Sequence, residues 1–225
     1  MAVRADTILN QAATDLNDAT HQYWPEDELL AYLNDGQQAA VILKPEVSPE
    51  VADFTLTAGA VQNFGSMADG YILLDVNCFK STASEYEGII TPVERKDMDN
   101  IDPGWRKPTT GQPPSDLSGN YVYDVRNRHT FYLYPSYTDW NNWLVEIVYA
   151  KSPAPIASTT SNITIDDIYA PALLAYVMHR ARAKDITVEG QSVQLSTAFY
   201  NKFVQLITGE TNQEREIIIR ADQTE

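Results

Sequence analysis

The sequence predicts an α+β fold, in which a helical bundle is formed by N- and C-terminal helix pairs and an antiparallel β-rich region is inserted between them. Apolar residues recur at helical spacing in the first 45 residues and again after residue 165. Between these segments, prolines and glycines recur every several residues, and the apolar runs are short and rich in Val, Ile, Tyr and Phe. Neither helix pair is long enough to bury its apolar stripe alone, so we expect the two pairs to pack together.

Two helices are predicted in the N-terminal segment. In residues 3–19 the larger apolar residues, Ile8 and Leu16 among them, fall on one helical face. The second helix is predicted from Pro25 to Leu43, because proline suits the first helical position and the three acidic residues that follow suit the positive end of the helix dipole. Pro45 ends this helix, because a residue that precedes proline avoids the helical conformation.

Six strands are predicted in the middle region, where short runs of β-branched and aromatic residues are separated by turn residues. The fourth and fifth strands are joined by residues 126–129, which predicts a hairpin with a four-residue loop. The predicted strands are Asp53 to Thr57, Tyr71 to Val76, Gly88 to Glu94, Tyr121 to Val125, Thr130 to Tyr134 and Trp143 to Tyr149.

Two further helices are predicted after a connector rich in Ser, Thr and Pro at residues 152–161. The third helix opens at Asp166 and carries cations in its last turns, where positive charge suits the helix dipole. The fourth runs from Ser192 to Thr208, and Gly209 is available as its C-terminal cap. The predicted organisation is residues 1–45 (N-terminal helices of the bundle), 46–165 (inserted β-rich region), 166–211 (C-terminal helices of the bundle) and 212–225 (extended tail).

Composition and charge argue against several classes of protein. The chain has 225 residues, of which 44% are hydrophobic, and this is enough for a sizeable core. It carries 16 Lys and Arg against 31 Asp and Glu, a net charge of −15, so we do not expect it to wrap nucleic acid. One cysteine and three scattered histidines cannot supply an internal disulfide or a Cys/His zinc site. Without a signal peptide or a membrane-spanning apolar stretch, we expect a soluble protein made in a cytoplasm, with no membrane contact.

The motifs that identify common enzymes are absent from the sequence. There is no Gly-rich phosphate loop, no GxSxG elbow and no HExxH pair. The acidic segment 97–102 resembles a calcium loop, but Ile101 takes the fifth position, so a short acidic helical turn is expected instead. Acidic pairs such as Glu85 and Glu87 are inevitable among 31 carboxylates and do not by themselves indicate a glycosidase. We therefore expect no enzyme activity, no metal and no cofactor.

An aromatic cluster follows the predicted hairpin and has three interpretations, a stacking platform for sugars or bases, a packed core, and a set of interface anchors. Tyr137, Trp140 and Trp143 lie close together in the sequence, in a loop that also contains two asparagines. Aromatic side chains that pair across antiparallel strands fill a small core. Exposed in a loop, the same residue types are typical anchors of a protein interface.

The order of several short motifs along the chain resembles a known family. The motifs are Trp24-Pro25 leading into Glu28-Leu29-Leu30-Ala31-Tyr32-Leu33-Asn34-Asp35, then Asp102-Pro103-Gly104-Trp105, Phe131-Tyr132-Leu133-Tyr134-Pro135, and Glu146-Ile147-Val148-Tyr149-Ala150-Lys151-Ser152-Pro153. With this order and spacing, and with its closing helical pair, the chain resembles the head-to-tail adaptor (connector) proteins of tailed bacteriophages. It is most similar to those of short-tailed phages, which sit directly below the portal, and the similarity extends from Ala5 to Gly209.

The resemblance implies a non-enzymatic structural protein of the virion, made in the host bacterial cytoplasm and located at the head-tail junction. Such a subunit forms a homo-oligomeric ring, commonly a dodecamer, that joins the portal protein to the tail or nozzle protein and continues the DNA exit channel. An acidic wall agrees with this function, because it lets double-stranded DNA pass without specific binding. The alternatives are a carbohydrate- or receptor-binding tail module that uses the aromatic loops, and a cell-wall glycosidase.

Two sets of residues are candidates for contacts of such an adaptor. The C-terminal tail contains Ile217, Ile218 and Ile219 between Arg215 and Arg220. Three consecutive β-branched residues are unfavourable in a terminus that is fully exposed to solvent. They either fold back onto their own domain or add to the portal or a neighbouring subunit as a strand or a hydrophobic peg. The second set, Tyr137, Trp140 and Trp143, is the candidate for a tail-side or subunit contact.

Overall fold

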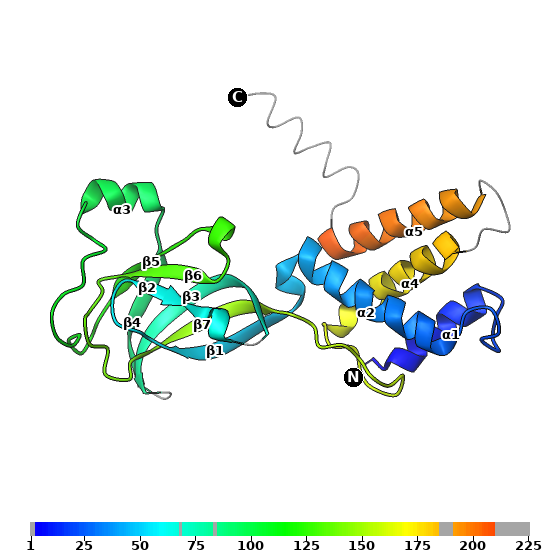
Figure 1. Cartoon of the computed structure of the whole chain (residues 1–225), viewed down its shortest axis with the longest axis horizontal. Coiled ribbons are helices and arrows are strands. Elements are labelled where there is room, and N and C mark those ends of the chain that lie inside the picture. Colours follow the sequence, from blue (N-terminus) through cyan, green and yellow to red (C-terminus); the bar gives the residue numbers. More distant parts are fainter. Residues whose placement is uncertain (1–2, 68, 83–84, 185–190, 210–225) are drawn as a thin grey trace, which may run out of the picture. The chain divides into compact units, whose positions relative to one another are not determined.

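A computed structural model describes residues 3–67, 69–82, 85–184 and 191–209 of the chain. It contains two compact units, which are shown in Figure 1. The helical unit is formed by residues 1–48 and 153–225, and the sheet unit by residues 49–152. Each unit has its own hydrophobic core and is described by itself.

The helical unit contains α1 (Ala5–Asp15), α2 (Glu26–Leu43), α4 (Ala170–Lys184) and α5 (Gln191–Thr208). Helix α4 packs against the other three helices, and α5 also contacts α2. The apolar stripes face inward, so that Leu33 of α2, Leu173 of α4 and Phe203 of α5 are fully buried. Two ion pairs join α2 to α4, Lys184 to Glu28 at 2.5 Å and Arg180 to Asp35 at 3.1 Å.

The loop between α1 and α2 is closed by the carboxylate of Asp18. Its two oxygens accept hydrogen bonds from the backbone N–H groups of residues 22–24, at 2.8 to 2.9 Å. The Trp24 N–H bond contributes most to holding the pKa of Asp18 below its usual value of 3.8. The loop ends at Pro25, the N-cap residue of α2, and the acidic first turn Glu26–Glu28 follows.

Two amide side chains of α2 hold the connector that leads from the last strand to α4. The side chain of Asn34 accepts a hydrogen bond from the Ile156 backbone N–H at 2.8 Å and donates one to the Ile156 carbonyl at 3.0 Å. Three residues further along the helix, Gln37 accepts hydrogen bonds from the backbone N–H and the hydroxyl of Thr164. Gln37 is buried, and its carbonyl oxygen is satisfied by these two bonds.

The sheet unit is built on a seven-stranded mixed sheet, with the strand order β1-β7-β3-β4-β5-β6-β2. Its strands are β1 (Pro49–Thr55), β2 (Val61–Asn63), β3 (Gly70–Thr82), β4 (Glu85–Pro92), β5 (Gly119–Tyr123), β6 (Thr130–Tyr134) and β7 (Leu144–Lys151). All neighbouring pairs are antiparallel except β4 and β5, which are parallel. The long connection that a parallel pair requires contains α3 (Arg95–Ile101).

The two faces of the sheet differ in what covers them. On the inner face, apolar and aromatic side chains of the strands form the main core, and Phe79, Phe131 and Ile147 are fully buried there. On the outer face, α3 and the residues after it cover β5 and β6, where Met98 and Trp105 pack on Val122. The alternation of the two faces follows from the period of two residues along each strand.

The predicted fold class is wrong in two respects. The sheet is mixed and not antiparallel, because strand β4 pairs with the sequence-distant β5 in parallel. The β-rich region is also more than an insertion into a helical bundle, since its seven strands and α3 enclose cores of their own. A curled seven-stranded mixed sheet with five α-helices in the whole described chain replaces the predicted bundle as the description of the fold.

Most local elements lie where the sequence places them. Strand β6 has the predicted bounds, and it pairs with β5 as the predicted hairpin, although the connection spans residues 124–129 because β5 ends earlier. Gly209 follows α5 with a φ of 69°, and its N–H donates to the Gln205 carbonyl, as expected of a C-terminal cap. Strand β2 was not predicted.

Candidate functional site

A buried lysine of the sheet unit forms an ion cluster with two carboxylates. Lys80 of β3 is 5% exposed, and its Nζ donates hydrogen bonds to Asp53 Oδ1 of β1 at 2.8 Å and to Glu146 Oε2 of β7 at 2.7 Å. The bonds to Asp53 and Glu146 raise the pKa of Lys80 above its usual value. The bond from Lys80 is also the main cause of the lowered pKa of Glu146.

This arrangement makes a fixed charge cluster and not an acid-base pair. The raised pKa of Lys80 and the lowered pKa of Glu146 keep both groups charged at neutral pH, so neither has a proton to exchange there. Asn77 donates a further hydrogen bond to Glu146 at 2.9 Å, and the Lys80 Nζ lies 5.1 Å from the centre of the Tyr86 ring. Sequence reasoning missed this cluster, although a lone lysine between Cys78-Phe79 and a polar segment was a signal for it.

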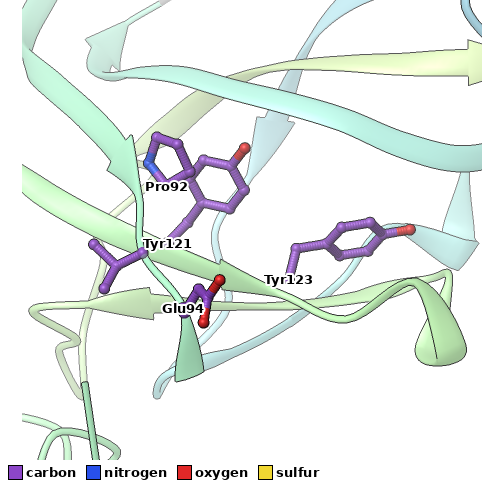
Figure 2. Close-up of a pocket in the computed structure, with 5 residues that line it drawn as sticks. Pro92, Glu94, Tyr121 and Tyr123 are labelled. Carbon is purple, nitrogen blue, oxygen red and sulfur yellow. The ribbon is translucent and has the colours of Figure 1, made fainter. Parts of the chain in front are cut away.

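A pocket of about 310 Å³ lies where β4 leaves the sheet beside β5 (Figure 2). It is lined by Pro92, Val93, Glu94, Tyr121 and Tyr123. Both tyrosine hydroxyls are already used, since Tyr121 donates to Asp75 at 2.9 Å and Tyr123 donates to the Arg128 carbonyl at 3.0 Å. Burial is the main cause of the raised pKa of both phenols. The pocket thus offers apolar and aromatic walls with one exposed carboxylate, and no pair of groups suited to proton transfer.

The predicted contact residues Tyr137, Trp140 and Trp143 lie in the core of the sheet unit. Their exposed fractions are 8%, 3% and 9%, and the ring of Trp140 stacks on Phe79 with centroids 5.8 Å apart. Tyr137 and Trp143 also lie in ring contact with Trp140. The burial favours the core interpretation of these rings, and a contact with the tail or a neighbouring subunit stays a prediction.

The second set of predicted contact residues, Arg215, Ile217, Ile218, Ile219 and Arg220, lies outside the described residues. The last described residue that precedes them is Gly209, after the end of α5. Their role as a portal or subunit interface stays a prediction from the sequence.

His179 lies beside a serine hydroxyl and joins two helices. His179 Nδ1 of α4 lies 2.9 Å from both the carbonyl oxygen and the Oγ of Ser196 in α5. The same hydroxyl also donates to the His179 carbonyl at 3.1 Å. Ser196 is 6% exposed and packed between helices, so this pair has no room for a substrate and links α4 to α5.

The acidic segment 97–102 forms the short helical turn that was expected, as α3 and its C-terminal cap. Asp99 accepts a hydrogen bond from Trp105 Nε1 at 2.8 Å and lies 3.6 Å from the Arg95 guanidinium. Asp102 accepts the Gly104 N–H. Within the described segments, no group of three or more His, Cys, Asp or Glu side chains is placed to hold a metal ion.

The single cysteine is not a reactive thiol, and the described helices are not membrane spans. Cys78 is buried, and burial is the main cause of the raised pKa of its thiol, so it is not a poised nucleophile. Among the helices that the structure describes, none combines the length and the apolar character that crossing a bilayer requires.

Comparison with known proteins assigns the chain to a family. A family model described as SU10 adaptor protein matches residues 3–222, which is nearly the whole chain. A search of curated proteins finds no match. The extent of the family match confirms the resemblance to phage adaptors that was inferred from the order of the motifs. The chain therefore belongs to the SU10 adaptor protein family, and it is a structural head-to-tail adaptor protein of tailed bacteriophages.

Proposed function

We propose that the chain forms a homo-oligomeric ring, a dodecamer, that joins the portal protein to the tail or nozzle protein and continues the DNA exit channel. The family match over residues 3–222 carries this proposal, because it covers both the helical unit and the sheet unit. A closed ring of identical subunits uses heterologous contacts, in which two different surfaces of each subunit meet. The adaptor acts at the head-tail junction of the virion and needs no cofactor.

The charge of the chain supports passage of DNA through such a ring. Each subunit carries a net charge of −15, and both units contain more carboxylates than lysines and arginines. Twelve copies would bring about −180 charges before counterions, a field that opposes adhesion of the phosphate backbone. A duplex would therefore slide along an acidic wall and not bind to it.

The contact with the portal is proposed for the C-terminal tail. The run Ile217–Ile219, flanked by Arg215 and Arg220, would add to the portal or to a neighbouring subunit as a strand or a hydrophobic peg. The loop that contains Tyr137, Trp140 and Trp143 is proposed for the tail side. Its buried rings would fix the loop, while its exposed asparagines would meet the partner. A carbohydrate-binding module would need exposed rings, and burial of these three argues against it.

Electron microscopy of the purified chain, alone and with portal-bearing particles, tests the ring. We expect rings on the portal with a central channel, and weak, sequence-independent DNA binding that does not persist at physiological salt. The same particles test the tail: deletion of residues 212–225 should leave the melting temperature unchanged and abolish attachment. A compact non-ring particle on the portal, or a tight DNA complex with a steep salt dependence, would contradict the proposal.

A further inference from the structure

The outer face of the sheet is covered at one end and open at the other. Met98 and Trp105 cover it over β5 and β6, as described above. At the β1 to β4 end of the same face, Val51, Tyr86 and Ile89 are 58%, 68% and 66% exposed. Large apolar side chains gathered on an open sheet face are typical of an interaction surface.

Strand register places these side chains in rows with the Lys80 cluster. Directly paired residues of antiparallel strands lie on the same face, and bulges in β3 and β4 preserve this arrangement across four strands. We call two adjacent rows the outer patch. The first row holds Asp53, Glu146, Cys78 and Ile89, and the second holds Thr55, Leu144, Lys80 and Tyr86.

The outer patch combines apolar side chains with a charge cluster that has one excess negative charge. Its single cation, Lys80, lies between the two carboxylates of Asp53 and Glu146. Their side chains are 29% and 18% exposed, so both remain accessible to a partner. A complementary surface is therefore apolar, free of carboxylates, and furnished with one positive charge.

One flank of α5 has this character. Leu195, Lys202 and Leu206 follow one another at spacings of seven and four residues, which places them on one side of the helix. Leu195 and Leu206 are 47% and 41% exposed. Helix α5 contains no Asp or Glu, and Lys202 forms no ion pair with any residue that the structure describes. In a chain of net charge −15, such a surface is suited to meet the acidic outer patch.

We propose that the Leu195–Lys202–Leu206 flank of α5 in one subunit packs on the outer patch of the next subunit. Leu195, about 10 Å from Lys202 along the helix axis, would cover Ile89 and Tyr86 on β4, and the Lys202 ammonium would approach Glu146 on β7 and Asp53 on β1. This inference rests on the proposed ring and names the two surfaces that meet in it. Because the surfaces differ, the contact is heterologous and can repeat around a closed ring.

The size of the outer patch determines how the contact must be measured. Four strands at about 4.8 Å spacing are about 14 Å wide, and the two rows span only a few residues along them. This area is far below the roughly 800 Å² per partner of a stable complex, so an isolated pair of subunits binds weakly. A covalent trap detects such a contact more reliably than a measurement of free oligomers.

The test uses single-cysteine chains, all with Cys78→Ala, because Cys78 lies opposite Ile89 in the sheet and would form a disulfide within the chain with a cysteine at position 89. The patch chain carries Ile89→Cys, and the helix chain carries Leu195→Cys. The control chain carries Val193→Cys, which is on α5 and 68% exposed but lies on the other flank of the helix. The chains carry tags of different length, so that heterodimers and homodimers differ in size. They are mixed in pairs under mild oxidation, and the disulfide-linked products are separated on a non-reducing gel.

We expect the patch-helix heterodimer in several-fold higher yield than the patch-control heterodimer. When Lys202→Glu is added to the helix chain, the yield of the patch-helix heterodimer should fall to that of the control. With Lys202→Arg, which keeps the positive charge, the higher yield should remain. Equal yields with Val193→Cys, a predominance of patch-patch or helix-helix homodimers, or no heterodimer at all would overturn the assignment of these surfaces. Micrographs of the same chains bound to portal-bearing particles keep the two proposals apart. Rings on the portal without the heterodimer refute only the assigned contact, and the heterodimer without rings on the portal refutes only the ring.

Discussion

Replacing Lys80 by methionine tests whether the buried ammonium holds strands β1, β7 and β3 together on the outer face of the sheet. Lys80→Met keeps a side chain of similar length but removes the cation, which leaves the carboxylates of Asp53 and Glu146 without their common partner. Removing one member of a fully buried ion pair costs about 3 to 5 kcal/mol. Because both carboxylates retain some access to solvent, we expect a smaller loss of about 2 kcal/mol in the free energy of unfolding at neutral pH.

The stability difference between the parent and Lys80→Met should depend on pH. The pKa of Glu146 is lowered in the folded protein, so its stabilising effect is present above its unfolded value of about 4.5 and is lost as the pH falls through the folded value. In Lys80→Met the facing carboxylates repel one another, which raises the pKa of at least one of them. The stability difference between parent and variant should therefore be largest at neutral pH and shrink as the pH falls below about 4.5.

The measurement is urea unfolding followed by tryptophan fluorescence, because Trp140 and Trp143 report on the sheet core. Lys151→Met is the matched control. Lys151 also faces two carboxylates on the sheet, Glu50 at 3.8 Å and Asp69 at 3.3 Å, but its side chain is 41% exposed, and we expect a loss below about 1 kcal/mol. If Lys80→Met is no more destabilising than Lys151→Met, or if its effect does not shrink in acid, the reasoning is refuted.

Three further substitutions test the two cores and the α1–α2 loop. Leu173→Ala removes a fully buried side chain of α4 and should cost about 3 kcal/mol, seen as a lower melting temperature by circular dichroism. Gly119→Ala would place a Cβ 2.3 Å from the Tyr134 carbonyl oxygen, so we expect a loss of about 2 kcal/mol or more, and a stability equal to the parent's would contradict this close approach. Asp18→Ala removes the acceptor of three N–H groups in residues 22–24 and should lower the melting temperature. Because the pKa of Asp18 is lowered, the difference between Asp18→Ala and the parent should narrow in acid, as the parent loses that carboxylate.

The helices could be predicted because their determinants are local. Pro25 and the acidic turn after it mark the start of α2, and Gly209 marks the end of α5. The apolar spacing of Leu29 and Leu33 likewise shows which face of α2 is buried. Each of these signals acts within a few residues, and the structure retains all of them.

The pairing of the strands could not be predicted, because it depends on residues far apart in the sequence. Strand β4 pairs in parallel with β5, and nothing in the composition of either strand specifies that direction. Strand β2 is three residues long and contains Gln62, a polar residue that is fully buried. Its side chain is satisfied by hydrogen bonds with Thr57 and the Gly59 carbonyl. These partners come close to Gln62 only when the loop that precedes β2 is folded, so the sequence alone does not identify them.

The candidate interaction surface was hidden from sequence reasoning for a related reason. Along β3, Cys78 and Lys80 look like interruptions of an apolar strand, and both Asp53 and Glu146 look like ordinary solvent-facing residues of separate strands. Only the register of β1, β7 and β3, with the bulge between Val76 and Cys78, gathers them on one face. A one-residue slip in that register would turn Lys80 toward the core, away from both carboxylates, which is strongly unfavourable for a charged group. The ion cluster therefore also fixes the register that creates the outer patch, so that folding and the proposed subunit contact depend on the same three charges.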